Sequence, residues 1–194
     1  MFTGLIEAVG EVAGVHPTAS GGLRIGVRTR LAAHLQVGDS LAVNGVCLTA
    51  VSTAGGEVTA DIGPETTRVT TLGSLTAGTL VNLERSMAAD GRFGGHFVQG
   101  HVDGVATVRD IVEDGFARIV TFSAPAELLR YIVEKGSIAV DGVSLTVSAV
   151  DDVSFAVSLI PGTLERTTLG TAEPGRPVNL EVDVLAKYVE KLAR

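Results

Sequence analysis

The sequence has few of the residues that several large classes of protein require. It contains one cysteine among 194 residues, which excludes an intrachain disulfide framework and suits a reducing cytosol. Only 4% of the residues are aromatic, so stacking platforms for nucleic-acid bases are scarce. Basic residues number 15 against 22 acidic ones, a net charge of -7, and an acidic surface repels phosphate backbones. These shortages predict a cytoplasmic protein that does not bind nucleic acid.

Long apolar runs and the common binding motifs are also missing. No run approaches the ~20 apolar residues that span a bilayer, and residues 1–4 lack the basic start of a secretion signal, so no membrane partner is expected. The glycines of segment 91–95 have the wrong spacing for a phosphate loop or a dinucleotide fingerprint. The four histidines are scattered around a single cysteine. We therefore expect no metal and no cofactor.

The most informative feature that is present is an internal duplication. At an offset of 97 three blocks recur: residues 43–49 (VNGVCLT) as 140–146 (VDGVSLT), 64–73 as 161–170, and 81–84 (VNLE) as 178–181. The start aligns at an offset of 96, with residues 4–7 matching 100–103. The repeats predict two domains, residues 1–97 and 98–184, followed by a tail, residues 185–194.

Each half consists of short runs rich in Val, Ile, Leu and Thr, separated by glycine, which is typical of β-strands. The dipeptides at 44–45 and 141–142 (Asn-Gly and Asp-Gly) tolerate the positive φ angles of a two-residue hairpin turn. One short helix is expected in each half, at 31–36 and 125–134, and strands elsewhere. Six or so strands in ~90 residues cannot leave long edges unpaired, so the pattern predicts a small closed barrel, with a two-sheet sandwich as the alternative.

The tail has the pattern of an amphipathic helix. Its apolar stripe consists of Val184, Leu185, Tyr188, Val189 and Leu192, with Lys187, Glu190 and Lys191 opposite. So short a helix is unstable alone. We expect it to pack on its own barrels or on a partner subunit.

Strand alternation sorts the residues after each hairpin into two faces. Cys47 and Thr49 share one face, opposite their apolar neighbours, and Ser144 and Thr146 share the equivalent face of the second half. Each barrel thus offers a matched pair of small hydrogen-bonding or nucleophilic side chains. This predicts two similar ligand sites, which would suit a reaction between two identical molecules.

Polar differences between the halves are candidates for unequal roles. They are Cys47 against Ser144, Asn44 against Asp141, Leu5 against His101, and Gly38 against Lys135. A histidine titrates near neutrality and can pass protons, which makes His101 the best general acid or base. A lone cysteine is more often a small buried apolar residue, and a serine an ordinary strand residue. From the residues alone, the prediction stops at a duplicated barrel that binds two similar small ligands.

In this order and at these separations, the blocks resemble riboflavin synthases of the single-polypeptide (alpha) type over essentially the whole chain. The matching pieces are residues 1–4, 44–49, 94–102, 135–136, 141–146 and 164–170. The resemblance implies an all-β fold of two tandem six-stranded Greek-key barrels with a short C-terminal helix. It also implies a homotrimer, held partly by those helices, in which the N-terminal barrel of one subunit faces the C-terminal barrel of its neighbour at each productive site.

The reaction that the resemblance implies is a dismutation, the last step of riboflavin biosynthesis. Two 6,7-dimethyl-8-ribityllumazine molecules exchange a four-carbon unit, giving riboflavin and 5-amino-6-(ribitylamino)uracil, without cofactor or metal. One molecule must lose a proton from its acidic C7 methyl group while the other accepts a nucleophile at C7. Stacking the two rings in register should supply much of the rate, since proximity can contribute ~7–11 kcal/mol. Lumazine synthase is a further candidate partner.

The candidate catalytic residues are Cys47, His101, Ser144, Lys135, Asp141 and Phe2. We expect Cys47 and Ser144 at the two reacting centres, as nucleophile, proton relay or positioner of water. His101 would help with acid–base chemistry, and Lys135 and Asp141 would tune the protonation of His101 and of Ser144.

Ligand binding is expected along four segments that resemble those of the family, together with the strands after the hairpins. Phe2 would hold the N-terminal segment against the site or cover a ring. Thr49, Thr66, Thr146 and Thr163 are suited to bond the pyrimidine edge and the ribityl hydroxyls. The full set is Gly4, Leu5, Ile6, Cys47, Leu48, Thr49, Asp61, Ile62, Gly63, Pro64, Glu65, Thr66, Gly100, His101, Val102, Lys135, Ser144, Leu145, Thr146, Ser158, Leu159, Ile160, Pro161, Gly162 and Thr163.

One departure and one rival interpretation accompany the resemblance. Gly162 stands where the first repeat, like the family in both repeats, has a glutamate, so the 161–165 loop is expected to hold its ligand differently. The rival is a non-catalytic lumazine- or flavin-binding protein of the same duplicated fold, which is expected to lack the reactive residues of one barrel. All six candidate catalytic residues are present here, which favours the enzyme.

Overall fold

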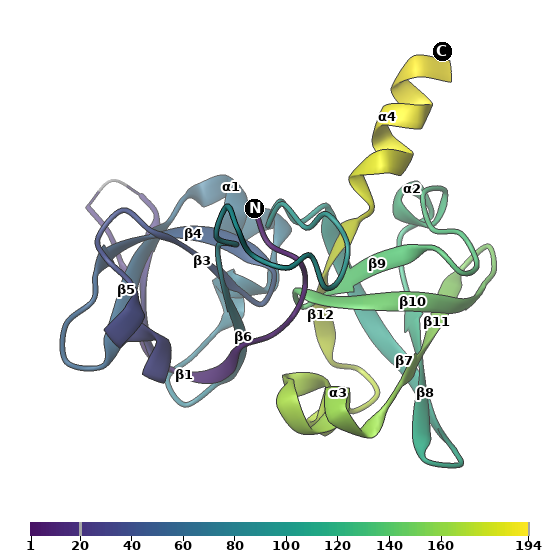
Figure 1. Cartoon of the computed structure of the whole chain (residues 1–194), viewed down its shortest axis with the longest axis horizontal. Helices are drawn as coiled ribbons and strands as arrows, with labels where there is room; N and C mark the ends of the chain where they lie inside the picture. The colour runs from purple at the N-terminus through teal and green to yellow at the C-terminus, as the bar shows by residue number, and fades with distance from the viewer. Residues whose placement is uncertain (20, 194) are drawn as a thin grey trace.

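The computed structural model describes residues 1–19 and 21–193 and contains two β-barrels that lie side by side (Figure 1). The first barrel is formed by β1 (Ala8–Pro17), β2 (Leu23–Arg28), β3 (Ser40–Val43), β4 (Val46–Ser52), β5 (Glu57–Ile62) and β6 (Leu80–Arg85). The second is formed by β7 (Gly104–Asp114), β8 (Ala117–Ser123), β9 (Ser137–Val140), β10 (Val143–Val150), β11 (Ser154–Leu159) and β12 (Pro177–Val182). The predicted pair of tandem six-stranded barrels is confirmed.

The two barrels have the same strand order. It is β1-β2-β5-β4-β3-β6 in the first and β7-β8-β11-β10-β9-β12 in the second, a Greek-key order. All pairings are antiparallel, and each sheet closes because β6 pairs with β1 and β12 with β7. Closure excludes the two-sheet sandwich. Matching β-bulges in β1 and β7, and in β4 and β10, bend the strands into small barrels.

The predicted hairpin turns are present and meet at the junction of the barrels. Asn44 and Asp141 both have φ 45°, and the glycine after each has φ 78°. A Cβ added to Gly45 would lie 2.7 Å from the backbone nitrogen of Gly142, and one added to Gly142 would lie 2.8 Å from that of Gly45. Glycine at these two positions therefore allows the two turns to touch.

Apolar side chains fill each barrel separately, and a third cluster lies between the barrels. Along β4 the burial alternates as expected, with Leu48 buried, Cys47 half-buried and Thr49 exposed. The third cluster consists of Phe2, Ala42, Val98 and Ala139, with Cys47 packed against it. Both halves therefore contribute to one shared core.

The helices inside the barrels differ from the expectation. The helix expected at 31–36 is a 3₁₀ turn, η1 (Arg30–His34), and the one expected at 125–134 is only α2 (Ala126–Leu129), capped by Pro125. The prediction for the second was therefore too long. Ile132 lies after the end of the helix and is buried in the barrel core, and the turn that follows leads into β9.

Four further short helices occupy segments expected to be strands. They are α1 (Pro64–Val69), η2 (Thr71–Ser74), α3 (Pro161–Arg166) and η3 (Thr168–Thr171). Pro64 and Pro161 begin α1 and α3, where a fixed φ favours a helix start. The hydroxyls of Thr70 and Thr167 accept hydrogen bonds at the starts of η2 and η3. These signals are visible in the sequence, and the strand prediction there was wrong.

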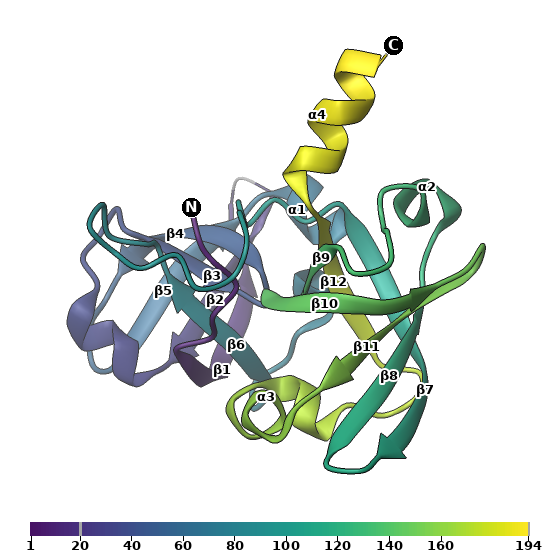
Figure 2. The same cartoon turned by 45° about the vertical axis from the view of Figure 1, so that its right-hand side comes forward.

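The C-terminal tail forms α4 (Val184–Ala193), which projects away from the barrels (Figures 1 and 2). Arg194, the last residue of the expected helix, lies outside the described residues. Lys187 Nζ contacts Asp103 Oδ1 at 2.6 Å, and Glu190 bonds Tyr131, which tie one side of α4 to the second barrel. Its apolar stripe, formed by Leu185, Tyr188, Val189 and Leu192, is exposed. In the described part of the chain, no helix is long and apolar enough to cross a membrane.

Candidate functional site

Cys47 and Ser144, the residues expected at the two reacting centres, occupy equivalent positions in the two barrels. Each is the second residue of its strand, β4 or β10, and each is half-buried on the face opposite the barrel core. The strands begin at the two touching hairpin turns. The junction between the barrels therefore fixes where both side chains lie.

Two extended segments cross between the barrels and reach these side chains. Phe2 and Val98 form an antiparallel bridge, with N···O distances of 2.7 and 3.2 Å. The carbonyl of Gly4 accepts a hydrogen bond from the Ser144 nitrogen at 2.8 Å, and that of Gly100 accepts one from the Cys47 nitrogen at 2.9 Å. The segment that begins each repeat therefore lies against the predicted reactive residue of the other repeat.

Buried glutamates hold the crossing segments. Glu84 accepts hydrogen bonds from the backbone nitrogens of Thr3 and Gly4 at 2.7 and 2.9 Å. Glu181, its counterpart in the second repeat, accepts three, from residues 99, 100 and 101, at 2.6 to 2.9 Å. Burial raises the pKa of both carboxyls, and the backbone donors oppose that rise. The hydrogen bonds from these backbone nitrogens offset the cost of burying each carboxylate. They also fix the backbone beside a predicted reactive residue.

Two glycines make this close approach possible. Gly4 has φ 78° and Gly100 has φ 81°, values that favour glycine. A Cβ on Gly4 would lie 2.5 Å from Ser144 Cβ, and one on Gly100 would lie 2.5 Å from Cys47 Cβ. The predicted ligand-holding residues 4 and 100 therefore shape the site through their backbone.

His96 is the functional candidate that the sequence prediction missed. Its Nδ1 lies 2.7 Å from Ser144 Oγ. The preceding residue, Gly95, also packs closely against this serine: a Cβ added to Gly95 would lie 2.9 Å from Ser144 Oγ. His96 precedes the segment that repeats the start of the chain, so comparing the two halves could not detect it. The Gly-Gly-His sequence before the crossing segment was the available signal.

The environment of His96 favours a neutral ring. Burial lowers the pKa of His96, and the charge of nearby Asp183 partly opposes that effect. Its Nε2 is buried and has no hydrogen-bond partner among the described residues. A neutral imidazole whose Nδ1 faces a hydroxyl can accept that proton. His101, the histidine favoured by the sequence, is exposed on the neighbouring segment.

The predicted ligand-holding segments 61–66 and 158–163 lie at equivalent places, where β5 leads into α1 and β11 into α3. Ile62 and Leu159 are buried in the barrel cores, so only their backbones can reach a ligand. Asp61 forms an ion pair with Arg24 at 2.6 Å, which lowers the pKa of its carboxyl. Glu65 is paired with Arg68 at 2.5 Å. A side chain on Gly162 would meet no atom within 4 Å, so the departure in the second repeat opens space there.

The threonines and the remaining segment residues divide by exposure. Thr49 and Thr146 are exposed, and Thr66 and Thr163 are half-buried. Both pairs can thus donate to or accept from a ligand on the outer face. Leu145 and the crossing-segment residues Ile6 and Val102 are half-buried, so they can offer apolar contact beside the reactive strands.

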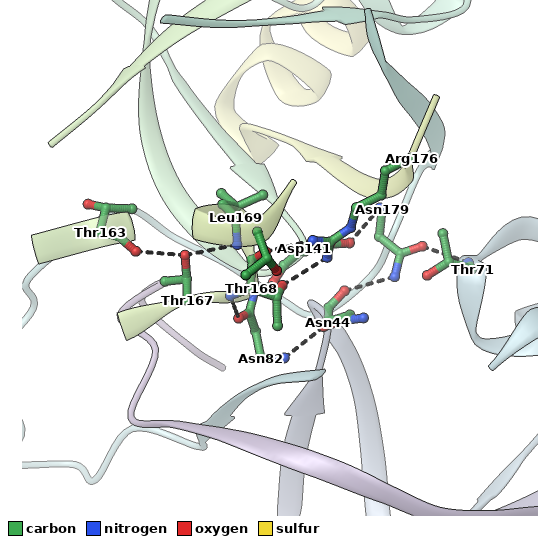
Figure 3. Close-up of polar contacts among 11 residues, drawn as sticks. Asn44, Thr71, Asn82, Asp141, Thr163, Thr167, Thr168, Leu169, Arg176 and Asn179 are labelled. Atoms are coloured by element: carbon green, nitrogen blue, oxygen red, sulfur yellow. Dashed lines mark hydrogen bonds and ion pairs between the residues drawn. The ribbon is translucent and has the colours of Figure 1, made fainter. Parts of the chain in front are cut away.

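Three predicted catalytic residues lie in settings that also have structural roles. Phe2 is fully buried in the shared core. Lys135 has φ 64° in the turn before β9, where its backbone nitrogen bonds Val147. Asp141 is 1% exposed, and its carboxylate accepts hydrogen bonds from the Asn179 nitrogen at 2.8 Å and from Arg176 at 3.0 Å (Figure 3). The carboxylate of Asp141 is thus bonded to residues at the barrel junction and not to Ser144. The side chain that contacts the Ser144 hydroxyl is His96.

The burial of Asp141 predicts a pH effect on stability. Burial raises the pKa of Asp141 from 3.8 to about 6, against the opposing charge of Arg176. The folded state therefore holds this proton more tightly than the unfolded chain does. Its contribution to stability is complete below about pH 4 and is lost as the pH rises through about 6. Asp141→Asn is expected to remove this decline, which is at most about 1.4 kcal/mol per pH unit.

Urea unfolding of the wild type and the variant between pH 4 and 7 checks this prediction. The exposed Asp152 provides a matched control, because Asp152→Asn should leave the wild-type profile unchanged. Parallel profiles for the wild type and Asp141→Asn would contradict the assignment.

Cavities of ligand size border the site without enclosing it. One of about 550 Å³ is lined by Ile6, Glu7, Ala8, Val9, Arg30, Glu165 and Arg166. Another of about 440 Å³ includes Leu5 and Glu84 in its lining. Cys47 and Ser144 line neither of these two cavities.

Comparison with known proteins agrees with this duplicated architecture. A family model described as a lumazine binding domain matches residues 3–86 and again residues 99–183. The riboflavin synthase of Mycobacterium tuberculosis is 49% identical over 199 aligned positions, covering 100% of this chain and 98% of that protein. Those of Actinobacillus pleuropneumoniae and Schizosaccharomyces pombe are 46% and 44% identical, covering 98% and 99% of this chain and 89% and 93% of the relatives.

Solved structures with the same fold include LumP complexed with riboflavin and LumP complexed with 6,7-dimethyl-8-(1'-D-ribityl) lumazine. Their TM-scores are 0.86 and 0.85, with 28% sequence identity over 94% of this chain and 99% of LumP. The fold itself is thus shared by proteins that differ substantially in sequence. With two lumazine binding domains and relatives that match it almost from end to end, this chain belongs to the riboflavin synthase family.

Proposed function

We propose that this protein converts two molecules of 6,7-dimethyl-8-ribityllumazine into riboflavin and 5-amino-6-(ribitylamino)uracil, as a cofactor-free transferase of the cytoplasm. The observation that carries the proposal is the pair of equivalent sites around Cys47 and Ser144, each completed by a segment of the other repeat. Two matched sites suit a reaction that consumes two copies of one substrate. A complex with lumazine synthase stays a prediction.

The two sites differ in the chemistry they can perform. Ser144 has His96 at hydrogen-bond distance, whereas the Cys47 thiol has no histidine partner within residues 1–19 and 21–193. We therefore assign the proton relay to the second barrel: His96 Nδ1 takes the proton of Ser144 Oγ as that oxygen removes one from the substrate or from water. Cys47, in the first barrel, would act as nucleophile or position water, with His101 as exposed acid or base.

The remaining candidate residues would hold the two lumazines. The segments 61–66 and 158–163 offer backbone groups and the hydroxyls of Thr66 and Thr163. Lys135 and Asp141 keep the proposed role of tuning protonation, exerted by Asp141 through the position of the hairpin that begins β10.

The reaction assay is the direct test of this function. Purified protein mixed with 6,7-dimethyl-8-ribityllumazine alone should form riboflavin, followed by absorbance. Stoichiometric binding without turnover would instead support the carrier function, for which LumP is the structural neighbour that binds such ligands.

Cys47→Ser and His101→Ala are each expected to slow turnover more than they weaken lumazine binding. His101 is exposed, and serine is close in size to the half-buried Cys47 that it replaces, so both variants should fold. General acid–base catalysis alone contributes about 10²–10⁴-fold. Steady-state rates and lumazine titrations separate the two effects. Full activity in both variants would refute these role assignments while leaving the family unchanged.

We further propose a homotrimer in which α4 packs against another subunit. Leu185 and Tyr188 are 57% and 62% exposed, and an uncovered apolar stripe of this kind is typical of an interface. Leu185→Glu with Tyr188→Glu is expected to reduce the mass in sedimentation to that of one chain and to abolish turnover. Lys191→Glu, on the polar face of α4, is the matched control. An unchanged mass in the double variant would contradict the trimer contact.

A further inference from the structure

A cavity of about 400 Å³ lies at the junction of the two barrels, apart from Cys47 and Ser144. Its lining comes from both repeats and includes Asn44, Thr71 and Thr79 of the first and Asp141, Thr168 and Arg176 of the second. Arg176 and Asp141 are the charged residues in this lining. The proposed reaction does not use the cavity, so its polar groups need a separate explanation.

A network of hydrogen bonds from buried asparagine side chains joins the two sides of the cavity, and these bonds follow the pseudo-twofold symmetry of the repeats (Figure 3). Asn82 Nδ2 donates to the Asp141 carbonyl at 3.0 Å, and Asn179 Nδ2 donates to the Asn44 carbonyl at 2.8 Å. Asn82 Oδ1 accepts from the Thr168 nitrogen and Asn179 Oδ1 from the Thr71 nitrogen, both at 2.8 Å. Up to this point the two halves match bond for bond.

The symmetry ends at Arg176. Its NH2 group donates to Asp141 Oδ2 at 3.0 Å and to Thr168 Oγ1 at 2.9 Å, and its NH1 group donates to the Thr168 carbonyl at 2.6 Å. At the equivalent position the first repeat has Thr79, which is too short to reach so far. One guanidinium therefore bonds polar groups of Asp141 and Thr168 in the second half. Among the described residues of the first half, Thr79 supplies no equivalent donor.

Two of the three groups that Arg176 satisfies in the second half, Asp141 Oδ2 and Thr168 Oγ1, have counterparts without a partner among the described residues of the first. The third differs, because the Thr71 carbonyl accepts a hydrogen bond from Ser74 Oγ at 2.9 Å. Asn44 is 4% exposed, and its Oδ1 accepts from the Asn82 nitrogen at 2.7 Å, which directs Nδ2 elsewhere. No acceptor for this Nδ2 lies within hydrogen-bond distance in residues 1–19 and 21–193. Thr71 Oγ1, the counterpart of Thr168 Oγ1, is buried and has no partner within the same ranges. The Thr71 hydroxyl is thus a buried polar group without a partner, which is costly and marks a place where a ligand can bind. The Asn44 amide, in the same cavity lining, is available to donate.

The unsatisfied groups define what would bind there. Asp141 presents an acceptor to a cation, whereas Asn44 presents a donor, so the missing group must supply an acceptor. Arg176 lies in the same cavity, and its Nε makes no hydrogen bond within residues 1–19 and 21–193. The ion pair between Arg176 and Asp141, at 3.0 Å, largely cancels both charges, so hydrogen-bond donors rather than net charge would hold an anion here. We propose that this cavity binds a small oxyanion between Asn44, Thr71 and Arg176.

Inorganic phosphate is the probe for the first test, titrated into ¹⁵N-labelled protein against sodium chloride of equal ionic strength. The Asn44 side-chain amide resonances are expected to shift with a saturable dependence on phosphate. Glycerol 3-phosphate, titrated in parallel, distinguishes a site for free phosphate from one that accepts a phosphate monoester. A linear drift of these resonances, the same in phosphate and chloride, would show an adventitious ion only and overturn the proposal.

The second repeat supplies the design of a blocking variant. Asn44→Asp together with Thr79→Arg gives the first half the Asp and Arg of the second, at unchanged net charge. Asp141 already adopts φ 45° as Asn44 does, and its Oδ1 accepts the same backbone bond, so the turn should be kept. Filling the vacancy is expected to lower phosphate affinity at least about tenfold, the loss of several hydrogen bonds. Equal affinity in wild type and variant would overturn the proposal.

Thr71→Val is a milder variant that keeps the test valid if the double variant fails to fold. The Thr71 hydroxyl has no partner in the part of the chain that the structure describes, so its removal should not reduce stability. Loss of one neutral hydrogen bond should weaken phosphate binding about two- to tenfold. Unchanged affinity in Thr71→Val, with a folded chain, would remove Thr71 from the site and contradict the geometry proposed.

Discussion

His96→Ala is expected to reduce riboflavin formation by about 10²–10⁴-fold, the usual contribution of a general acid or base, with little change in lumazine binding. The reason is the 2.7 Å contact between His96 Nδ1 and Ser144 Oγ, which lets the imidazole take the hydroxyl proton. Single-turnover rates measured beside equilibrium lumazine titrations test the prediction. His16→Ala, at an exposed histidine that lines neither cavity beside the site, is the matched control and should be fully active.

The pH profile gives an independent measure of the same group. Burial lowers the pKa of His96. The ring therefore stays neutral, and can act as a base, at a pH where a free histidine would already be half protonated. Turnover should therefore hold constant through about pH 6.5 and decline only at lower pH. His96→Asn preserves a hydrogen bond to Ser144 but cannot take its proton. A wild-type rate in His96→Asn would exclude the relay.

Phe2→Ala should lower the free energy of unfolding by about 3–5 kcal/mol, the range for deleting a buried aromatic ring. Phe2 is 0% exposed and lies in the core shared by the two halves, against Ala42, Val98 and Ala139. Chemical denaturation measures the loss. Phe116→Ala removes a phenylalanine that is 77% exposed and should change stability by less than about 0.5 kcal/mol.

The variant also separates two interpretations of Phe2. If Phe2 fixes the N-terminal segment, the loss of stability and the loss of turnover should occur together, and Phe2→Leu should restore much of both. If it covers a substrate ring, Phe2→Ala should abolish turnover without loss of stability. The second result would require the ring to leave its buried position when the ligand binds.

The barrels were predictable because the duplication doubled a weak signal. A single Asn-Gly dipeptide between apolar runs is one turn among many, but its recurrence as Asp-Gly at a fixed offset identified both hairpins. The short helices after β5 and β11 were missed because strand composition outweighed the signals of Pro64 and Pro161 at helix starts and of the capping threonines. These signals are local, so the helices could have been predicted from the sequence.

The site was predictable where it follows strand alternation and unpredictable where it depends on contacts between distant segments. Cys47 and Ser144 emerged from the pattern, whereas His96 reaches Ser144 only because the chain crosses between the barrels. Asn44 and Asp141 were recognised as a difference between the halves. The consequence of that difference depends on Arg176, which stands where the first half has Thr79. Arg176 is 35 residues further along the chain than Asp141, and their contact is evident only in three dimensions.

The exchange of the crossing segments means that neither half of the chain is a self-sufficient unit. Residues 2–4 pair with the second half, and residues 98–100 pair with the first. Two copies of a half-length polypeptide, each lending its leading arm to the other, would form the same set of contacts as a domain-swapped homodimer. The present chain has the architecture that fusion of two such genes would produce. In such a fusion, residues 87–96 would be the linker that joins the two swapped halves covalently.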